Sequence, residues 1–171
     1  MGSVASILGF KMNTVKSIQE QRQQNSHEIL TRLRKILPTV LAEYPVDAAY
    51  VFGSVARGVV MPSSDVDIAL LLANSLPAYE RLKLELSMQE AIEREMEPTS
   101  IDVRSMNDAP LLVKGRIIQQ GVLVYERNRK SRIAFEVAIR KRYSDFAPAA
   151  RRLQDAFLEH IHRKGIIRDR Y

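Results

Sequence analysis

The chain has 171 residues, a length that suits one domain with an appendage better than two full domains. Hydrophobic residues make up 46% and charged residues 27%, a composition that can build a buried core. The chain has no cysteine, which excludes disulfide bonds and thiolate metal sites and is compatible with a cytoplasmic location. No apolar run approaches the roughly 20 residues that a membrane-spanning helix needs.

The positive charge lies at one end of the chain. The formal net charge is +6, and residues 126–171 contain 13 Lys or Arg against 6 Asp or Glu, whereas residues 1–125 contain 13 against 14. A basic segment of this kind can meet nucleic acid or an acidic protein surface. The basic region is therefore a candidate for contact with a partner.

The chain is expected to begin with a flexible or weakly helical extension, residues 1–25. From Ser26 to Leu41 apolar residues recur at helical spacing, with Asn25 or Ser26 as the expected N-cap. Pro38 is expected to bend or split this helix, because proline lacks the N–H donor and clashes with the preceding turn.

The central part of the chain alternates between strand and helix signals. Strands are expected at residues 48–52, 67–72, 100–103 and 122–125. A turn or two of helix follows Gly53, a second helix covers 76–96, and a third, capped by Asp108, ends at Gly121. The pattern predicts an α/β domain with a small mixed sheet flanked by helices, covering residues 26–125. Residues 126–171 are expected to form a basic helical extension that is interrupted at Pro148.

Two carboxylates stand at the start of the second strand. Asp65 and Asp67 are two residues apart, so on a strand they point to the same face. Ionised carboxylates at this spacing repel, and a hard cation such as Mg²⁺ relieves the repulsion. Asp102, in the next strand, can join them if the two strands are neighbours, which would complete a two-metal site.

The end of the first strand offers a cradle for phosphate. Gly53 permits close backbone approach, Ser54 adds a hydroxyl donor, and Arg57 adds a positive charge one turn later. Ser64, directly before the first acid, is a further candidate for nucleotide binding. Because only residues 55–64 connect this turn to Asp65, the two strands are expected to run antiparallel.

The segments Val51–Gly58 and Ser64–Ile68 resemble the signature of DNA polymerase β-like minimal nucleotidyltransferases, and in particular the MNT antitoxins of HEPN–MNT toxin–antitoxin pairs. The resemblance covers roughly residues 48–125. It implies a Mg²⁺-dependent enzyme, with two ions, that transfers AMP from ATP to a tyrosine of a HEPN ribonuclease. It also implies phosphate binding at Gly53 and Ser54, with Asp65, Asp67 and Asp102 as metal-binding acids.

The acceptor stays open on sequence grounds. An RNA-directed transferase, a small-molecule (antibiotic) transferase, and an antitoxin that acts by binding alone are the alternatives. The aromatic residues after Asn128 keep helical spacing and do not interleave with the basic ones, which favours a protein partner over nucleic acid. Assembly into homo- or hetero-oligomers is also open.

Overall fold

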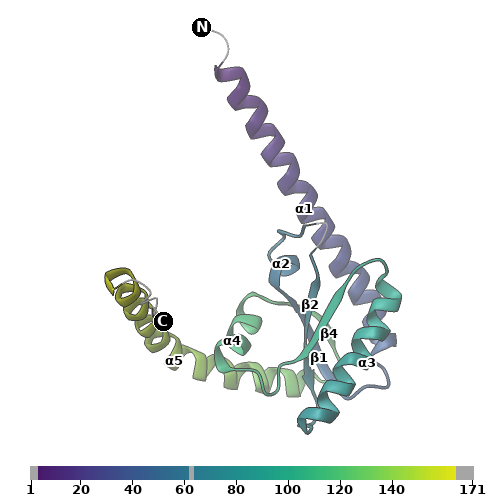
Figure 1. Cartoon of the computed structure of the whole chain (residues 1–171). Coiled ribbons are helices and arrows are strands. Elements are labelled where there is room, and N and C mark those ends of the chain that lie inside the picture. Colours follow the sequence, from purple (N-terminus) through teal and green to yellow (C-terminus); the bar gives the residue numbers. More distant parts are fainter. Residues whose placement is uncertain (1–3, 62–63, 165–171) are drawn as a thin grey trace, which may run out of the picture.

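The computed structural model describes residues 4–61 and 64–164; the outermost residues of both predicted extensions, 1–3 and 165–171, lie outside the described part. A four-stranded sheet carries helices on both faces (Figure 1). The elements are α1 Val4–Val40, β1 Val46–Phe52, α2 Gly53–Ala56, β2 Val66–Leu72, α3 Ala78–Met96, β3 Ile101–Ser105, α4 Leu111–Gln120, β4 Val122–Glu126 and α5 Arg129–Lys164. The predicted fold class is confirmed.

The order of the strands brings three important chain segments to one edge of the sheet. The order is β3-β2-β1-β4, with β1 antiparallel to both β2 and β4, and β3 parallel to β2. The antiparallel pairing of β1 with β2, expected from their short connection, is confirmed. As a result, β1 ends where β2 and β3 begin, so Gly53 lies at the same edge as the acids of the next two strands.

Each face of the sheet packs against its own pair of helices. Val51, Ile68 and Val103 belong to the core shared with α1 and α3. Tyr50 and Ala69, one position along the same strands, belong to the core shared with α4 and α5. Since both faces are covered, β1 and β2 are buried almost throughout, which explains their nearly continuous apolar sequences.

Helix α1 is one continuous helix of 37 residues, and residue 25, the expected end of the N-terminal extension, lies inside it. The N-cap expected at Asn25 or Ser26 is wrong. Ser26 is buried within the helix, and its hydroxyl donates a hydrogen bond to the Arg22 carbonyl at 3.0 Å. No proline lies before Ser26 in the sequence, so the helix continues through this position. Pro38 does not split the helix, because it falls in the last turn.

The start of α4 also differs from the sequence-based expectation. Pro110 occupies the N-cap position, and Asp108 instead pairs with Arg81 of α3. Gly121 ends the helix as predicted, and its N–H donates to the Ile117 carbonyl at 2.7 Å. Asp108 therefore ties α3 to the loop before α4 rather than capping the helix.

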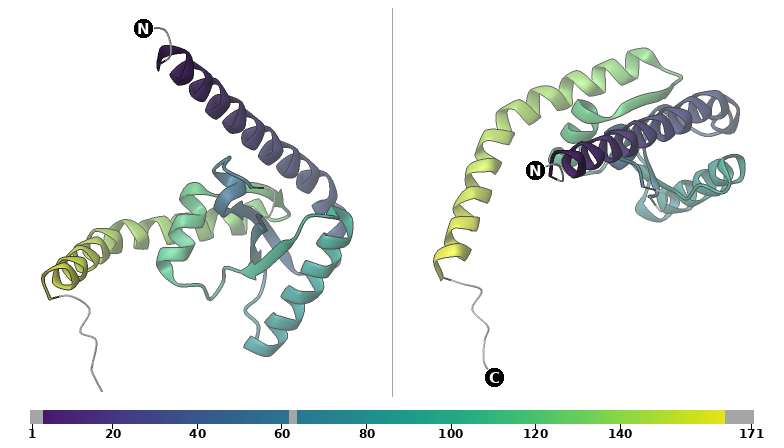
Figure 2. Two further views of the ribbon diagram at one scale, coloured as in Figure 1. Left: turned by 45° about the horizontal axis from the view of Figure 1, so that its top comes forward. Right: turned by 90° about the horizontal axis from the view of Figure 1, so that it is seen from above.

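Helix α5 runs unbroken for 36 residues, so the interruption expected at Pro148 is wrong. Pro148 and Ser144, whose carbonyl loses its hydrogen bond, are both exposed, and water can satisfy that carbonyl. The part of α5 beyond Pro148 extends away from the sheet (Figure 2). Among the described residues, no helix is long and apolar enough to cross a bilayer.

The first half of α5 is fixed to the sheet by polar contacts. The Tyr50 hydroxyl donates to Glu136 Oε1 at 2.6 Å, and Arg132 donates to the same oxygen at 2.6 Å. Ile139 is buried in the same core as Tyr50. Gly115 of α4 lies so close to the Tyr143 ring that a β-carbon would stand 2.0 Å from Cδ2. These contacts make the first half of α5 a covering layer of the sheet.

Candidate active site

Gly53 directly follows β1 as the first residue of α2, and it lies against Asp67 of β2. Its φ of 70° lies in the left-handed region that favours glycine. A β-carbon at this position would come within 2.1 Å of Asp67 Oδ2. The register explains the approach, because Phe52, the residue before Gly53, pairs with Asp67 across the two strands. The peptide backbone at Gly53 can therefore reach a ligand that Asp67 also contacts.

The sheet brings the predicted acids together. Asp67 and Asp102 are register partners on the parallel strands β2 and β3. Asp65 is exposed and lies just before β2 begins. The condition set by the sequence, that the third strand lies beside the second, is met. All three acids thus lie at the edge of the sheet where Gly53 lies.

The electrostatics of Asp67 show how closely the acids are grouped. Burial raises the pKa of its carboxyl above the ordinary value, and the charges of Asp102 and Asp65 raise it further. The Arg57 guanidinium opposes this effect and lowers the pKa. The free protein therefore concentrates negative charge at this edge, which a bound cation would offset.

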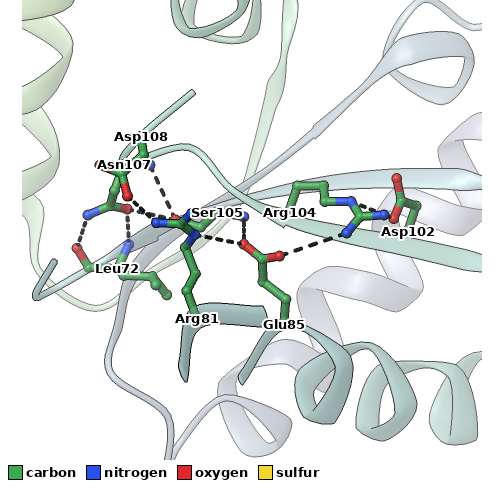
Figure 3. Close-up of polar contacts among 8 residues, drawn as sticks. All are labelled: Leu72, Arg81, Glu85, Asp102, Arg104, Ser105, Asn107 and Asp108. Carbon is green, nitrogen blue, oxygen red and sulfur yellow. Dashed lines mark hydrogen bonds and ion pairs between the residues drawn. The ribbon is translucent and has the colours of Figure 1, made fainter. Parts of the chain in front are cut away.

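Asp102 has a cationic neighbour on its own strand. Arg104 Nε lies 3.2 Å from Asp102 Oδ1, and Arg104 Nη1 lies 3.8 Å from Glu85 Oε2 (Figure 3). Glu85 of α3 is buried and accepts a hydrogen bond from the Ser105 N–H at 2.8 Å. Through this network α3 fixes β3, and β3 carries Asp102.

The far end of β3 is fixed by a side-chain amide. Asn107 accepts a hydrogen bond from the Leu72 N–H at 2.9 Å and donates one to the Leu72 carbonyl at 2.9 Å (Figure 3). The amide thus replaces a strand partner where β3 has ended. Together with Glu85, it holds the register that places Asp102 beside Asp67.

The other predicted nucleotide-binding residues differ in their surroundings. Ser54 is half-buried in the single turn of α2, and Arg57 is exposed at its end. The Ser64 hydroxyl accepts a hydrogen bond from the Met61 N–H at 3.0 Å, and the Ser64 N–H donates to the Met61 carbonyl at 2.9 Å. Ser64 thus stabilises the turn before Asp65, and its hydroxyl already has a partner within the chain.

Two cavities open on either side of this edge. One, of about 310 Å³, is lined by Phe52, Gly53, Arg57, Val113, Arg116, Ile117 and Gln120. The other, of about 530 Å³, lies between α1, the turn before β2 and the start of β3, and Ser64 and Asp65 line it. Helix α4 lines the first cavity and α1 lines the second, and these helices cover opposite faces of the sheet. Asp65 lines the second cavity, whereas Asp67 and Asp102 line neither.

The acids fit a hard divalent cation by their chemistry. They offer only carboxylate oxygens, the ligands that Mg²⁺ prefers. In residues 4–61 and 64–164 no three acidic or histidine side chains already surround a common point, and Asp102 is turned toward Arg104. Side-chain rotation would be needed to close the set around an ion.

Comparison with known proteins assigns the chain to a family. The family model described as polymerase beta, nucleotidyltransferase, matches residues 34–130, which is more than half of the chain. The chain belongs to this family. The match spans Gly53 and the three acids, and the predicted resemblance is confirmed.

Relatives and solved structures agree with this assignment. A Methanocaldococcus jannaschii protein named "Putative protein adenylyltransferase" is 30% identical over 89 residues, which is 52% of this chain and 89% of that protein. A crystal structure of a toxin–antitoxin with AMP-PNP has a TM-score of 0.58 at 20% identity, covering 73% of this chain and 98% of the other. The crystal structure of a mutant of the toxin–antitoxin MntA–HpeT has a TM-score of 0.57 at 17% identity, with the same coverage of both chains. These structures share the fold of the nucleotidyltransferase.

Sequence reasoning missed two cations of the nucleotidyltransferase. Arg104 follows Asp102 by two residues on a strand, so the spacing rule that paired Asp65 with Asp67 also applies to it. Arg116 lies more than fifty residues from Gly53, and only the packing of α4 brings it to the same cavity. No local pattern in the sequence could have shown that contact.

Proposed function

We propose that this nucleotidyltransferase transfers AMP from ATP to a hydroxyl group, a tyrosine by the resemblance, of a HEPN-type toxin and so acts as its antitoxin. One observation carries the proposal: the backbone of Gly53 lies against Asp67, and Asp102 stands in register beside it. A turn that can approach phosphate and a group of acids thus meet at one edge of the sheet.

The residues of the turn bind and orient the nucleotide. Gly53 leaves room for phosphate oxygens beside its peptide, Ser54 donates a hydroxyl hydrogen bond, and Arg57 supplies positive charge. Arg57 is suited to this role because its charge lowers the pKa of Asp67, which shows that it acts on this part of the site. Holding the α-phosphate in one position lowers the entropic part of the barrier.

Asp65, Asp67 and Asp102 would hold Mg²⁺, which when bound neutralises charge on the phosphates and on the departing pyrophosphate. The Asp102 carboxylate acts as the general base and takes the proton from the acceptor hydroxyl. The acceptor oxygen bonds to the α-phosphorus, the bond from that phosphorus to pyrophosphate breaks, and the proton passes to the Asp102 carboxylate. The products are an adenylylated acceptor and pyrophosphate.

The acceptor reaches the acids from the larger cavity. Asp65 lines that cavity, whereas Gly53 and Arg57 line the other one. In-line displacement requires the attacking and leaving oxygens to lie on opposite sides of the phosphorus. The proposal therefore places the acceptor in the larger cavity and the pyrophosphate beside Gly53. The similar solved structures are toxin–antitoxin structures, one of them with AMP-PNP, which supports a toxin as the acceptor.

The proposal is tested by following label from ATP. The purified chain is incubated with Mg²⁺ and a purified HEPN-type toxin, with ATP labelled at either the α or the γ phosphate. We expect the toxin to gain the α label but not the γ label, and pyrophosphate to accumulate in equal amount. The D65N/D67N double variant should transfer neither.

The alternatives give different results in the same assay. Label on added RNA, or on an aminoglycoside, with none on the toxin would show a different acceptor. Inhibition of the toxin ribonuclease without any covalent label would show that the antitoxin acts by binding alone. Either result would contradict the proposed function.

A further inference from the structure

One wall of the smaller cavity is formed by α4 and not by the edge of the sheet that carries the acids. Helix α4 presents residues at positions 113, 116, 117 and 120, which share one helical face, toward Gly53 and Arg57. The cavity is thus closed on one side by the phosphate-binding turn and on the other by α4. No acidic side chain belongs to its lining.

Two arginines from different elements face this space. Arg57 ends α2 and Arg116 lies in the middle of α4, and both are exposed. In the described part of the chain neither lies within 4 Å of a carboxylate, whereas five other arginines do: Arg81, Arg94, Arg104, Arg132 and Arg140. Arg57 acts on Asp67 through its charge, but neither guanidinium forms a direct ion pair with a described residue, and the cavity lining contains two arginines and no acid. The lining therefore carries a net positive charge.

The position of the cavity relative to the acids suggests which anion it takes. Negative charge gathers at Asp65, Asp67 and Asp102, and the cavity begins at Gly53, whose backbone touches Asp67. If the α-phosphate lies at the acids, as the proposed function requires, the β and γ phosphates can continue past Gly53 toward Arg116. Guanidinium groups bind phosphate through paired, charge-assisted hydrogen bonds.

We propose that Arg116 and Arg57 clamp the terminal phosphates of the nucleoside triphosphate from opposite walls of this cavity, with Arg116 as a binding residue on α4. The inference rests on the proposed function for the placement of the α-phosphate. Arg116 would add to the positive charge of Arg57, because α2 has only four residues and carries no charge of its own. It also makes the site selective for triphosphates over monophosphates.

The test compares ligands that differ in their phosphates. Isothermal titration of the full chain measures affinity for ATP with Mg²⁺, for inorganic tripolyphosphate with Mg²⁺, and for AMP. We expect Arg116→Ala to weaken ATP and tripolyphosphate by about tenfold to a hundredfold, the usual size for a hydrogen bond to a charged group, and to leave AMP unchanged. Arg116→Lys should restore part of the loss, because it keeps the charge without the paired donors.

A matched control removes the same charge elsewhere. Arg34 is exposed on α1 and lines neither cavity, so Arg34→Ala should bind all three ligands as the wild type does. Thermal melting of each variant excludes a loss of fold. The loss at Arg116→Ala should shrink as salt rises, since the contact is ionic.

The outcomes separate this inference from the proposed function. Unchanged ATP affinity in Arg116→Ala, with a wild type that binds ATP and labels its acceptor, overturns the clamp and leaves the function standing. Equal losses for AMP and ATP would show that the cavity holds the nucleoside, which also overturns it. A wild type that binds tripolyphosphate through Arg116 but transfers no AMP would retain the clamp and contradict the function.

Discussion

The α-carbon of Gly53 lies so close to the carboxylate of Asp67 that a side chain at residue 53 would collide with it: a β-carbon would stand 2.1 Å from Oδ2. This contact joins the turn proposed to bind phosphate to the acids proposed to act in catalysis. Any substitution at residue 53 must displace Asp67 or move the turn. The contact therefore makes Gly53 part of the site by geometry as well as by backbone conformation.

Gly53→Ala is expected to lower AMP transfer about a hundredfold, because displacement of a catalytic group by about 1 Å has an effect of that order. Gly58→Ala is the matched control. Gly58 has the same φ of 70°, but its β-carbon would meet only Gln23 Cγ, at 3.4 Å. Both variants should lose stability by roughly 1–2 kcal/mol from the left-handed backbone, measured by urea unfolding. Equal activity losses in the two would show that backbone strain, and not Asp67, is responsible.

Asp67→Asn is expected to stabilise the metal-free protein at neutral pH. The folded protein holds a proton on Asp67 more tightly than the unfolded chain does, since the pKa of this carboxyl is raised in the fold. The free energy of unfolding therefore falls as pH rises through the raised pKa, and ionised Asp67 lowers stability above it. Asparagine cannot ionise and avoids this loss. The extra stability of the variant should shrink as pH falls and vanish below 3.8, the pKa of this carboxyl in the unfolded chain.

Melting in EDTA across this pH range checks the prediction. Magnesium should then reverse the order, because it stabilises the wild type by binding and the variant less. A variant that melts well below the wild type at pH 7 in EDTA would show that Asp67 contributes to stability rather than detracting from it.

Asp102→Ala is expected to abolish most transfer while leaving nucleotide binding within a few-fold. The turn at Gly53 and the acids of β2 remain, but the group that takes the proton is gone, and such groups contribute about 10² to 10⁴ in rate. Titration with AMP-PNP and Mg²⁺, beside the label-transfer assay, measures the two effects. Loss of affinity with transfer retained would assign Asp102 to nucleotide binding. Arg104→Ala, which removes the partner of Asp102 and keeps the acid, should retain transfer.

Removal of residues 155–171 is expected to leave a folded domain that binds ATP, while toxin labelling falls steeply. The first half of α5, which Glu136 and Ile139 fix to the sheet, stays intact. The removed part includes Phe157, a residue that is 63% exposed. Phe157→Ser should reproduce part of the loss, and complex formation should weaken with salt because α5 is basic.

Leu86→Ser provides the comparison for this surface, because Leu86 is 53% exposed on α3. It should label the toxin at the wild-type rate. If it, and not the truncation, lowers labelling, then the partner docks on α3. An insoluble truncated protein would show instead that the end of α5 belongs to the core.

The core elements and the acids were predictable from the sequence because their signals are local. Strand alternation, the glycine after β1 and the two-residue spacing of Asp65 and Asp67 each lie within a few residues. The errors arose where local signals compete with context. Ser26 looks like an N-cap, but a helical segment precedes it, and Pro148 looks like a helix end, but water can satisfy the carbonyl it frees. No local pattern in the sequence indicates Arg116, because its place beside Gly53 depends on how α4 packs.

The most direct test of the catalytic arrangement is the intact mass of the HEPN-type toxin after co-expression with this chain. With the wild-type chain we predict that the toxin gains the mass of one or more AMP units. With the soluble, folded D65N/D67N variant the toxin should keep its unmodified mass while still forming a complex. A toxin that is unmodified with both chains, or equally modified with both, would contradict the assignment of AMP transfer to these acids.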